Sequence, residues 1–335
     1  MTRRCRIAVL GAGSWGTALA ALLVRNGHET LLWGRDEAML ADIARSGGNE
    51  KYLPGQRLPD RLVVEPNLSR AVEAASALLV AVPSHAFREL VAGLAGMQAC
   101  PAGLLWATKG LDPASGRLLN EVAAELLPPG VPLGVLSGPT FAGEVVRRLP
   151  TAVTLAATDA GFAREWAGRL SNSRFRVYTS DDLAGVQIAG GVKNVLAIAA
   201  GIADGLGFGA NTRAALIARG LSEMVRLGEA AGGRAATFMG LAGLGDLVLT
   251  CTDDQSRNRR FGLALARGLP PAEAVAAVGQ VVEGIETSAQ VLALSRRYGI
   301  EMPICEQVRA VVTGASSAGD AVQALLARDA ARPER

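Results

Sequence analysis

A glycine-rich turn close to the N-terminus constrains the fold of this chain more than any other feature. The mostly apolar residues 5–10 predict a short buried strand, which runs directly into Gly11-Ala12-Gly13-Ser14-Trp15-Gly16. Residues 17–25 predict a helix that stops at Asn26-Gly27, and residues 29–33 predict a second strand. Glycines at the spacing G-x-G-x-x-G let the backbone and the helix N-terminus approach a pyrophosphate. In this strand–turn–helix context, the segment indicates a dinucleotide-binding unit rather than an unrelated glycine turn.

The end of the second predicted strand bears on which dinucleotide is bound. A site specific for NAD usually has Asp or Glu there, which binds the ribose 2′-hydroxyl. This chain has Trp33-Gly34-Arg35, followed by Asp36. Arg35 can bind a 2′-phosphate, so the sequence favours NADP over NAD. The alternative is that Arg35 lies on a solvated turn and Asp36 binds the hydroxyl.

Further strand-like runs alternate with helical segments up to about residue 180. Runs at 77–82, 103–107 and 133–136 end at Pro83, at Lys109 and at Gly138-Pro139-Thr140, and two more follow at 152–156 and 175–178. This alternation predicts an α/β fold with a Rossmann-type, doubly wound and mostly parallel sheet. Ligands bind beyond the carboxyl ends of such strands, so we expect Lys109, Gly138 and Thr140 around one crevice.

After Asp181 the strand patterns end and only helical patterns follow. We therefore expect a dinucleotide-binding domain at residues 1–180 and an all-α, substrate-binding domain at residues 181–335. A chain of 335 residues with 50% hydrophobic residues can form two separate cores.

Composition excludes several classes of function. A net charge of +3 and 4% aromatic residues argue against a dedicated nucleic-acid binder. The uncharged stretch 7–24 is interrupted by the motif glycines, and no other stretch approaches the length of a membrane span, so we expect a soluble, cytoplasmic protein. Cys5, Cys100, Cys251 and Cys305 are scattered, which predicts free thiols and no metal site.

Lysine is rare in this chain, which draws attention to its positions. The basic residues comprise only three lysines, Lys51, Lys109 and Lys193, among 34 Lys and Arg. Lysine can give up a proton near neutral pH, whereas arginine cannot. Lys193 lies in a small, apolar helical segment, so it is either paired with an anion or shifted towards its neutral form, and both states suit a proton donor and acceptor. The alternative is a lysine that extends to solvent.

Two further polar segments lie in the helical half. Gly240–Leu247 reads as a tight glycine turn that ends at Asp246 in an apolar run, so this carboxylate needs a cation, for which Lys193 is the candidate, or else caps a helix. Ser256-Arg257-Asn258 reads as the start of a helix, with Asp253 or Asp254 just before it as candidate caps. Arginines at a helix start oppose the helix dipole unless an anion binds there. We interpret it as a phosphate site, with a solvated basic face, to which Arg259 and Arg260 could belong, as the alternative.

Together these motifs resemble the bacterial NAD(P)-dependent glycerol-3-phosphate dehydrogenases. The resemblance rests on the glycine turn with Thr17-Ala18, Val82–His85, Ala107–Leu111, Ser137–Ala142, Val192–Val195, Gly243–Leu247, Ser256–Arg259, Gln280–Gly284 and Glu301–Pro303. These segments occur in the family's order and extend over most of the chain.

The resemblance implies a set of site residues. Cofactor contacts are expected, with the motif glycines included, at Gly11, Gly13, Ser14, Trp15, Gly16, Arg35, Lys109, Ala142, Arg257, Val281 and Glu283. Substrate contacts are expected at Lys109, Gly138, Thr140, Lys193, Asp246, Ser256, Arg257 and Asn258. Lys193 matches the family's proton donor and acceptor, Asp246 is expected to hold its ammonium, and Lys109 to add positive charge.

The resemblance also implies the reaction and the assembly. The expected reaction is reversible hydride transfer between NAD or NADP and a phosphorylated triose, interconverting dihydroxyacetone phosphate and sn-glycerol 3-phosphate for phospholipid synthesis, in a homodimer. One alternative is a dehydrogenase of a sugar acid or 3-hydroxy acid, whose carboxylate would occupy the arginine site. Another is a dinucleotide-sensing protein without turnover, against which Lys193 and Asp246 argue.

Overall fold

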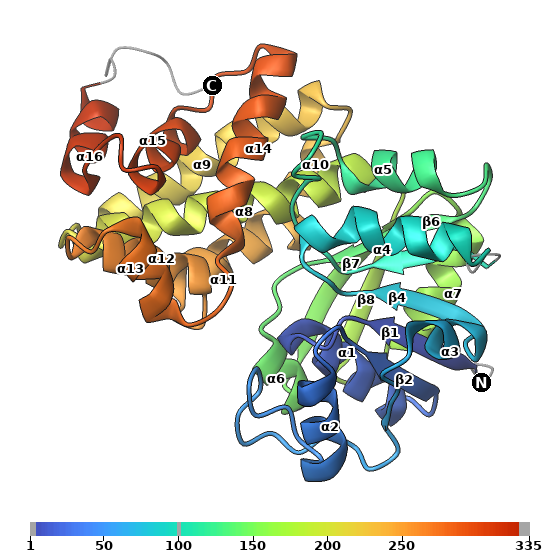
Figure 1. Ribbon diagram of the computed structural model, residues 1–335. Coiled ribbons are helices and arrows are strands. Elements are labelled where there is room, and N and C mark those ends of the chain that lie inside the picture. Colours follow the sequence, from blue (N-terminus) through green and yellow to red (C-terminus); the bar gives the residue numbers. More distant parts are fainter. Residues whose placement is uncertain (1–4, 99–101, 328–335) are drawn as a thin grey trace. The chain divides into compact units, whose positions relative to one another are not determined.

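The chain folds into two compact units (Figure 1). The computed structural model describes residues 5–98 and 102–327. The first unit consists of the described parts of Met1–Lys109 and Leu119–Leu183, and the second of Gly110–Leu118 and the described part of Ala184–Arg335. The sequence placed one boundary between residues 180 and 181. The structural division lies three residues later, and it also assigns the segment Gly110–Leu118 to the helical unit.

The first unit is built on an eight-stranded sheet with the order β3-β2-β1-β4-β5-β6-β7-β8. Neighbouring strands are parallel except for β6 and β7, which are antiparallel. The strands are β1 (Arg6–Leu10), β2 (Glu29–Trp33), β3 (Val63–Val64), β4 (Ala77–Val80), β5 (Leu104–Trp106), β6 (Leu133–Ser137), β7 (Thr151–Ala157) and β8 (Phe175–Ser180). The predicted Rossmann-type, mostly parallel sheet is confirmed. The strand order reverses between β1 and β4, which is where such sheets bind ligands.

Helices cover this sheet. They are α1 (Ser14–Arg25), α2 (Glu37–Ser46), α3 (Leu68–Glu73), α4 (Ser84–Gly96), α5 (Leu119–Leu126), α6 (Ala142–Val146) and α7 (Ala160–Leu170). Helix α1 packs against α6 and α7, whereas α4 packs against α5. All residues of β4, β5 and β6 are buried, as expected for strands that helices cover on both faces.

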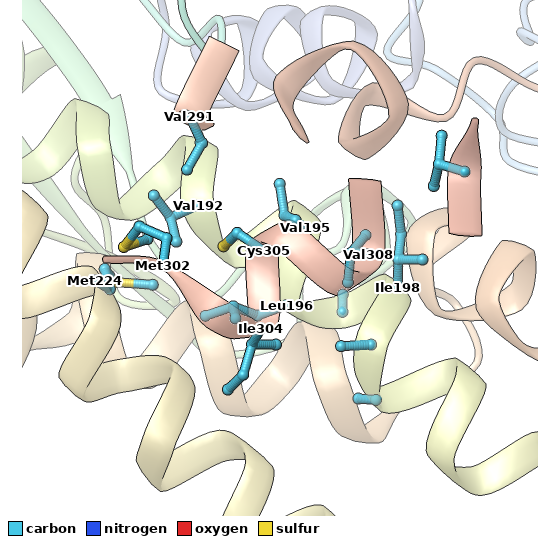
Figure 2. Packing of buried hydrophobic residues seen from close by; sticks show 14 of the residues in the cluster. Val192, Val195, Leu196, Ile198, Met224, Val291, Met302, Ile304, Cys305 and Val308 are labelled. Atoms are coloured by element: carbon cyan, nitrogen blue, oxygen red, sulfur yellow. The ribbon is translucent and has the colours of Figure 1, made fainter. Parts of the chain in front are cut away.

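Among the described residues of the second unit, all regular elements are helices, as predicted. Its helices are α8 (Leu183–Gly205), α9 (Ala210–Ala230), α10 (Ala235–Phe238), the π-helix η1 (Leu241–Gly245), α11 (Asp246–Thr252), α12 (Arg257–Ala266), α13 (Pro271–Val278), α14 (Glu283–Tyr298), α15 (Pro303–Val312) and α16 (Ala318–Leu326). Figure 2 shows how α8 contributes to the core. Val192, Val195, Leu196 and Ile198 lie among buried side chains of α9, α14 and α15.

Helix α8 corrects one expectation from the sequence. It is long and apolar enough to be a candidate membrane span, although the sequence reading found no such stretch beyond the N-terminal one. Its apolar window is wholly buried inside the protein. The length and hydropathy of this helix are therefore those of a core helix in a folded unit. A second candidate among the described residues, Ala235–Thr252, is 39% buried and comprises α10, η1 and α11.

The segment predicted as a glycine turn is helical instead. Residues 241–245 form the π-helix η1, which continues directly into α11. A side chain at Gly243 would collide with the backbone of Phe238, because η1 packs tightly against α10. The glycines therefore permit close helix packing, and Asp246 begins a helix rather than ending a turn.

The cysteines in the described residues are free thiols. Cys251 and Cys305 are buried and Cys5 is partly exposed. Burial raises the pKa of Cys251 to about 12, which keeps this thiol protonated and unreactive. Cys100 lies outside the described residues. Within the described parts of the chain, no three His, Cys, Asp or Glu side chains are grouped so that they could hold a metal ion.

Candidate active site

The glycine turn of the first unit has the geometry of a nucleotide cradle. Gly11 has a φ of +129°, and a Cβ there would lie 2.5 Å from the carbonyl oxygen of Ala81. A Cβ at Gly16 would collide with the carbonyl oxygen of Gly11, whereas the space above Gly13 is open. Gly13 caps α1 without a side-chain hydrogen bond, so the first N–H groups of this helix can serve an anionic ligand. The turn therefore fits a dinucleotide pyrophosphate.

A buried amide that sequence reasoning missed holds this turn in place. Asn49 lies in the loop after α2 and is 1% exposed. Its Nδ2 donates to the carbonyl oxygen of Ala12 at 3.0 Å and to Thr17 Oγ1 at 2.9 Å. Asn49 belongs to no sequence motif. Its role depends on a loop that folds back to the glycine turn, since its partner Thr17 lies 32 residues earlier in the chain.

Arg35 and Asp36 follow β2, as the sequence predicts. Asp36 caps α2, since its Oδ1 accepts the N–H of Met39 at 3.0 Å. Its Oδ2 accepts a hydrogen bond from Lys51 Nζ at 3.1 Å. The Met39 N–H and then Lys51 lower the pKa of Asp36. The start of α2 and Lys51 therefore each engage one oxygen of the Asp36 carboxylate.

Three predicted residues gather at the carboxyl ends of β5 and β6. Lys109 Nζ lies 3.5 Å from the carbonyl oxygen of Gly138, which also accepts a hydrogen bond from Thr140 Oγ1 at 3.2 Å. Gly138 has a φ of +150°, and a Cβ there would lie 2.9 Å from the Cα of Val153. The expected grouping of Lys109, Gly138 and Thr140 at one edge of the sheet is thus present, and Ala142 opens α6 shortly after it.

The second unit holds a buried ion pair between α8 and α11. Lys193 Nζ lies 2.5 Å from Asp246 Oδ1 and 2.8 Å from Thr250 Oγ1. The side chains of Lys193 and Asp246 are 7% and 1% exposed. Lys193 therefore does not extend to solvent, and Asp246 does not cap α11, whose cap is Gly245. A buried lysine requires such a partner, because an isolated buried charge is very costly.

Thr250 completes this pair and was missed by the sequence reading. Its hydroxyl bonds to the carbonyl oxygen of Asp246 at 2.6 Å, one helical turn earlier. The i, i+4 spacing of Asp246 and Thr250 on one helix face was the available signal.

The start of α12 is tied to α8 and α14 by buried amides. Ser256 caps α12 by accepting the N–H of Arg259, so neither Asp253 nor Asp254 is the cap. Asn258 Nδ2 donates to Asn194 Oδ1 at 2.9 Å, and Asn258 Oδ1 accepts the N–H of Gly284 at 2.9 Å. Asn194 follows Lys193 directly, so this network joins the start of α12 to the ion pair.

Glu283 and Arg257 lie at the edge of the same network. Asn194 Nδ2 donates to Glu283 Oε2 at 3.3 Å, and Arg257 Nη2 lies 3.8 Å from Glu283 Oε1. Val281, two residues before α14, is exposed. Arg257 is partly exposed, so its guanidinium can reach a ligand.

Arg259 corrects the alternative of a solvated basic face. Its side chain is 10% exposed, and its Nη1 lies 2.6 Å from Asp204 Oδ2. Arg213 binds the same carboxylate at 2.9 Å. Arg259 is therefore a buried structural residue, and Arg260 is partly buried.

The predicted residues thus form two groups, one in each unit. The first unit holds Gly11, Gly13, Ser14, Trp15, Gly16, Arg35, Lys109, Gly138, Thr140 and Ala142. The second holds Lys193, Asp246, Ser256, Arg257, Asn258, Val281 and Glu283.

Comparison with known proteins agrees with this division. Residues 6–163 match the family model of the NAD-dependent glycerol-3-phosphate dehydrogenase N-terminus, and residues 182–323 match that of its C-terminus. A glycerol-3-phosphate dehydrogenase [NAD(P)+] of Stenotrophomonas maltophilia is 53% identical over 324 residues, which cover 97% of this chain and 95% of the relative. Its counterpart in Shewanella amazonensis is 54% identical, with 96% of each chain covered.

Solved structures show the same fold. The crystal structure of glycerol-3-phosphate dehydrogenase from Coxiella burnetii superposes with a TM-score of 0.94 at 47% identity, covering 97% of this chain and 99% of the other. The yeast glycerol-3-phosphate dehydrogenase superposes with a TM-score of 0.81 at 26% identity, covering 96% and 99%. With matches over nearly its whole length, this chain belongs to the NAD(P)-dependent glycerol-3-phosphate dehydrogenase family of oxidoreductases.

Proposed function

We propose that this chain catalyses the reversible reduction of dihydroxyacetone phosphate to sn-glycerol 3-phosphate with NADPH or NADH. Relatives that match this chain over nearly their full length are named for this activity. The observation that carries the proposal is a buried lysine–aspartate pair joined, through Asn194 and Asn258, to a helix start that bears an arginine. These are an acid–base group and a phosphate-binding group within one unit.

The first unit would hold the cofactor. The N–H groups at the start of α1 bind the pyrophosphate, and Arg35 binds a 2′-phosphate. Lys109 and Ala142 lie at the carboxyl edge of the sheet, on the side where such folds bind the rest of a dinucleotide. The family resemblance also assigns cofactor contacts to Arg257, Val281 and Glu283. The bound cofactor supplies the hydride that reduces the substrate's carbonyl carbon.

Lys193 is the proton donor in the reduction and the acceptor in the reverse direction. Its ammonium polarises the ketone and transfers a proton to the carbonyl oxygen as that oxygen becomes an alkoxide. Asp246 and Thr250 hold the nitrogen in place, at 2.5 and 2.8 Å. Because Asp246 is fully buried, its carboxylate is a close counter-charge for the ammonium.

The substrate phosphate binds at the start of α12. Ser256, Arg257 and Asn258 supply hydrogen-bond donors and positive charge for a dianion. The family resemblance also assigns substrate contacts to Lys109, Gly138 and Thr140, with Lys109 as a second positive charge. The phosphate site distinguishes this substrate from sugar acids and 3-hydroxy acids, whose carboxylates are planar and carry one charge.

The finer biological setting is also part of this proposal. We expect a cytoplasmic homodimer that supplies glycerol 3-phosphate for phospholipid synthesis, as the family resemblance implies. The α8 window counted as a candidate membrane span is buried inside the protein, which supports a soluble protein.

The test is a direct assay. Purified protein is mixed with NADPH or NADH and dihydroxyacetone phosphate, and the loss of nicotinamide absorbance is followed while the product is identified by mass and by a stereospecific assay. The proposal expects stoichiometric formation of sn-glycerol 3-phosphate. Turnover of a 3-hydroxy or sugar acid with none of dihydroxyacetone phosphate would contradict it.

A further inference from the structure

Lys51 is the one lysine that the proposed reaction does not use. It lies in the loop between α2 and β3, with its Nζ 3.1 Å from Asp36 Oδ2 and 5.5 Å from the centre of the Tyr52 ring. Every other basic position outside the two lysines of the active site is an arginine. A compact ammonium can pair with one carboxylate oxygen, whereas a guanidinium spreads its charge over a larger fork.

The loop that carries Lys51 is anchored to the cofactor cradle. Two residues before Lys51, the buried Asn49 bonds to Ala12 and Thr17 of the glycine turn. Two residues after it, the N–H of the buried Leu53 donates to the carbonyl oxygen of Asn49 at 2.7 Å. Glu50 is engaged within the loop, since its Oε2 accepts the N–H of Gly55. Lys51 is thus held beside the end of β2 by the same contacts that hold the glycine turn.

The charges at the end of β2 determine whether this position favours a ribose with a 2′-hydroxyl or one with a 2′-phosphate. Arg35 and Lys51 are positive and Asp36 is negative, while the Glu89 carboxylate lies 4.0 Å from Arg35. An unpaired Asp36 would attract a ribose diol and repel a 2′-phosphate, as acidic residues near this position do in NAD-specific sites. Lys51 occupies one oxygen of this carboxylate and offsets its charge, while the start of α2 occupies the other.

We propose that Lys51 is a specificity-determining residue that favours NADP over NAD by masking the Asp36 carboxylate. The inference rests on the proposed use of a nicotinamide dinucleotide and deepens it. Lys51 acts on the 2′-phosphate through Asp36, so removing Asp36's charge makes Lys51 dispensable.

Equilibrium binding of adenosine nucleotides tests this without turnover. Adenosine 2′,5′-bisphosphate and adenosine 5′-monophosphate differ only in the 2′-phosphate, and both are titrated into the protein by calorimetry. Lys51→Met should weaken the affinity for the bisphosphate by about tenfold or more, because an unmasked carboxylate then faces the 2′-phosphate. The affinity for the monophosphate should change by about twofold or less. Arg164→Met, an exposed arginine on α7, is the matched control and should change neither.

A double variant separates masking from direct contact. Asp36→Asn keeps a good helix cap but removes the charge. Lys51→Met/Asp36→Asn should recover most of the lost bisphosphate affinity if Lys51 acts through Asp36. A double variant as weak as Lys51→Met alone would overturn masking, and so would equal losses for the two nucleotides.

The failure of this inference is distinguishable from failure of the proposed function. If the native protein binds neither nucleotide, the proposed cofactor use itself fails. If it binds both and Lys51→Met changes neither, only the role of Lys51 fails. The ratio of kcat/KM for NADPH to that for NADH, measured with dihydroxyacetone phosphate, should shift towards NADH in Lys51→Met and return in the double variant.

Discussion

At the scale of single residues, the buried group that we propose transfers the proton is distinct from the helix start that we propose binds the phosphate. Lys193, Asp246 and Thr250 form one buried group, and Arg257 stands at the partly exposed edge of another. The two groups are joined by Asn194 and Asn258, which are amides and carry no charge. Changes at Arg257 should therefore affect substrate choice more than the fold of the ion pair.

Arg257 offers the sharpest test of phosphate recognition. Charge-assisted hydrogen bonds contribute on the order of 1.5–3 kcal/mol each, so Arg257→Ala should raise the KM for dihydroxyacetone phosphate by about tenfold or more. Turnover should fall too, because binding energy at the phosphate positions the carbonyl. Steady-state rates with dihydroxyacetone, which lacks the phosphate, provide the comparison. If Arg257→Ala still discriminates between the two ketones as strongly as the native enzyme, the phosphate binds elsewhere.

The sequence predicted the charged members of the site better than the neutral ones. Lys193 and Asp246 could be paired in advance because each lies in an apolar run and buried charges need counter-charges. Asn49, Asn194 and Thr250 could not be assigned, because a single amide or hydroxyl has no periodic signal and its partners come from distant segments.

At the scale of elements, the position of α12 depends on glycine contacts with α8. A Cβ at Gly262 would collide with the carbonyl oxygen of Ile198, and a Cβ at Gly201 with that of Arg259. The two helices therefore approach each other at backbone distance. This contact places Arg257 and Asn258, at the start of α12, beside the segment of α8 that carries Lys193.

Enlarging one of these glycines should separate the helices. Gly262→Ala should lower the free energy of unfolding by about 1–3 kcal/mol through overpacking. It should also raise the KM for dihydroxyacetone phosphate, since the start of α12 shifts. Gly93→Ala in α4 is the control, because no atom lies within 4 Å of its added Cβ and alanine favours a helix. Chemical denaturation measures the free energy of unfolding of both variants. Equal unfolding free energies for Gly262→Ala and Gly93→Ala would contradict close packing of α8 and α12.

Glu223 links α9 to the start of α15 and should make the second unit sensitive to pH. It is 2% exposed, and its carboxylate accepts the N–H of Ile304 at 2.8 Å. Burial, as the largest effect, raises the pKa of Glu223 from 4.5 to about 7. The folded state thus binds this proton more tightly than the unfolded chain. The resulting stabilisation is fully present below pH 4.5 and is lost as the pH rises through 7.

A neutral side chain at position 223 should remove this dependence. Glu223→Gln keeps an oxygen that can accept the Ile304 N–H and carries no charge. Between pH 5 and pH 8, unfolding free energy should fall more in the native protein than in Glu223→Gln, by roughly 2 kcal/mol. Urea unfolding followed by circular dichroism at each pH measures it. Identical pH profiles for the two proteins would show that Glu223 does not titrate in this range.

Elements with strong periodicity were predictable, and the exceptions have physical reasons. Helix α8 is almost wholly buried, so its 23 residues are mostly apolar and lack a polar face. The π-helix η1 was predicted as a turn, because its glycines are common to turns and to helices in close contact. Strand β3 has two residues, too few for an alternating pattern.

At the scale of the whole molecule, the two units carry different groups of polar and charged residues. The first has the fold and glycine cradle of a dinucleotide-binding domain, and the second has the buried ion pair and the helix start with its arginine. The sequence predicted this division from the change in periodicity near residue 181. The assignment of Gly110–Leu118 to the second unit was not predictable, since it depends on Leu111 and Leu118 being buried in the helical core.

The proposed reaction depends above all on Lys193, which we propose transfers the proton during ketone reduction. Arginine keeps the positive charge but cannot donate a proton near neutral pH. Lys193→Arg should therefore lose about a hundredfold or more in kcat for dihydroxyacetone phosphate. Because arginine is bulkier than lysine and position 193 is buried, Lys193→Ala provides a second variant, whose activity should be partly restored by added methylamine.

The decisive measurement is kcat for dihydroxyacetone phosphate with NADPH in the native enzyme, Lys193→Arg and Lys193→Ala, with and without methylamine. Circular dichroism and Tm establish that the variants are folded. The account predicts a large loss in both variants and amine-dependent recovery in Lys193→Ala alone. Near-native turnover of a folded Lys193→Arg enzyme would contradict it and remove Lys193 from proton transfer.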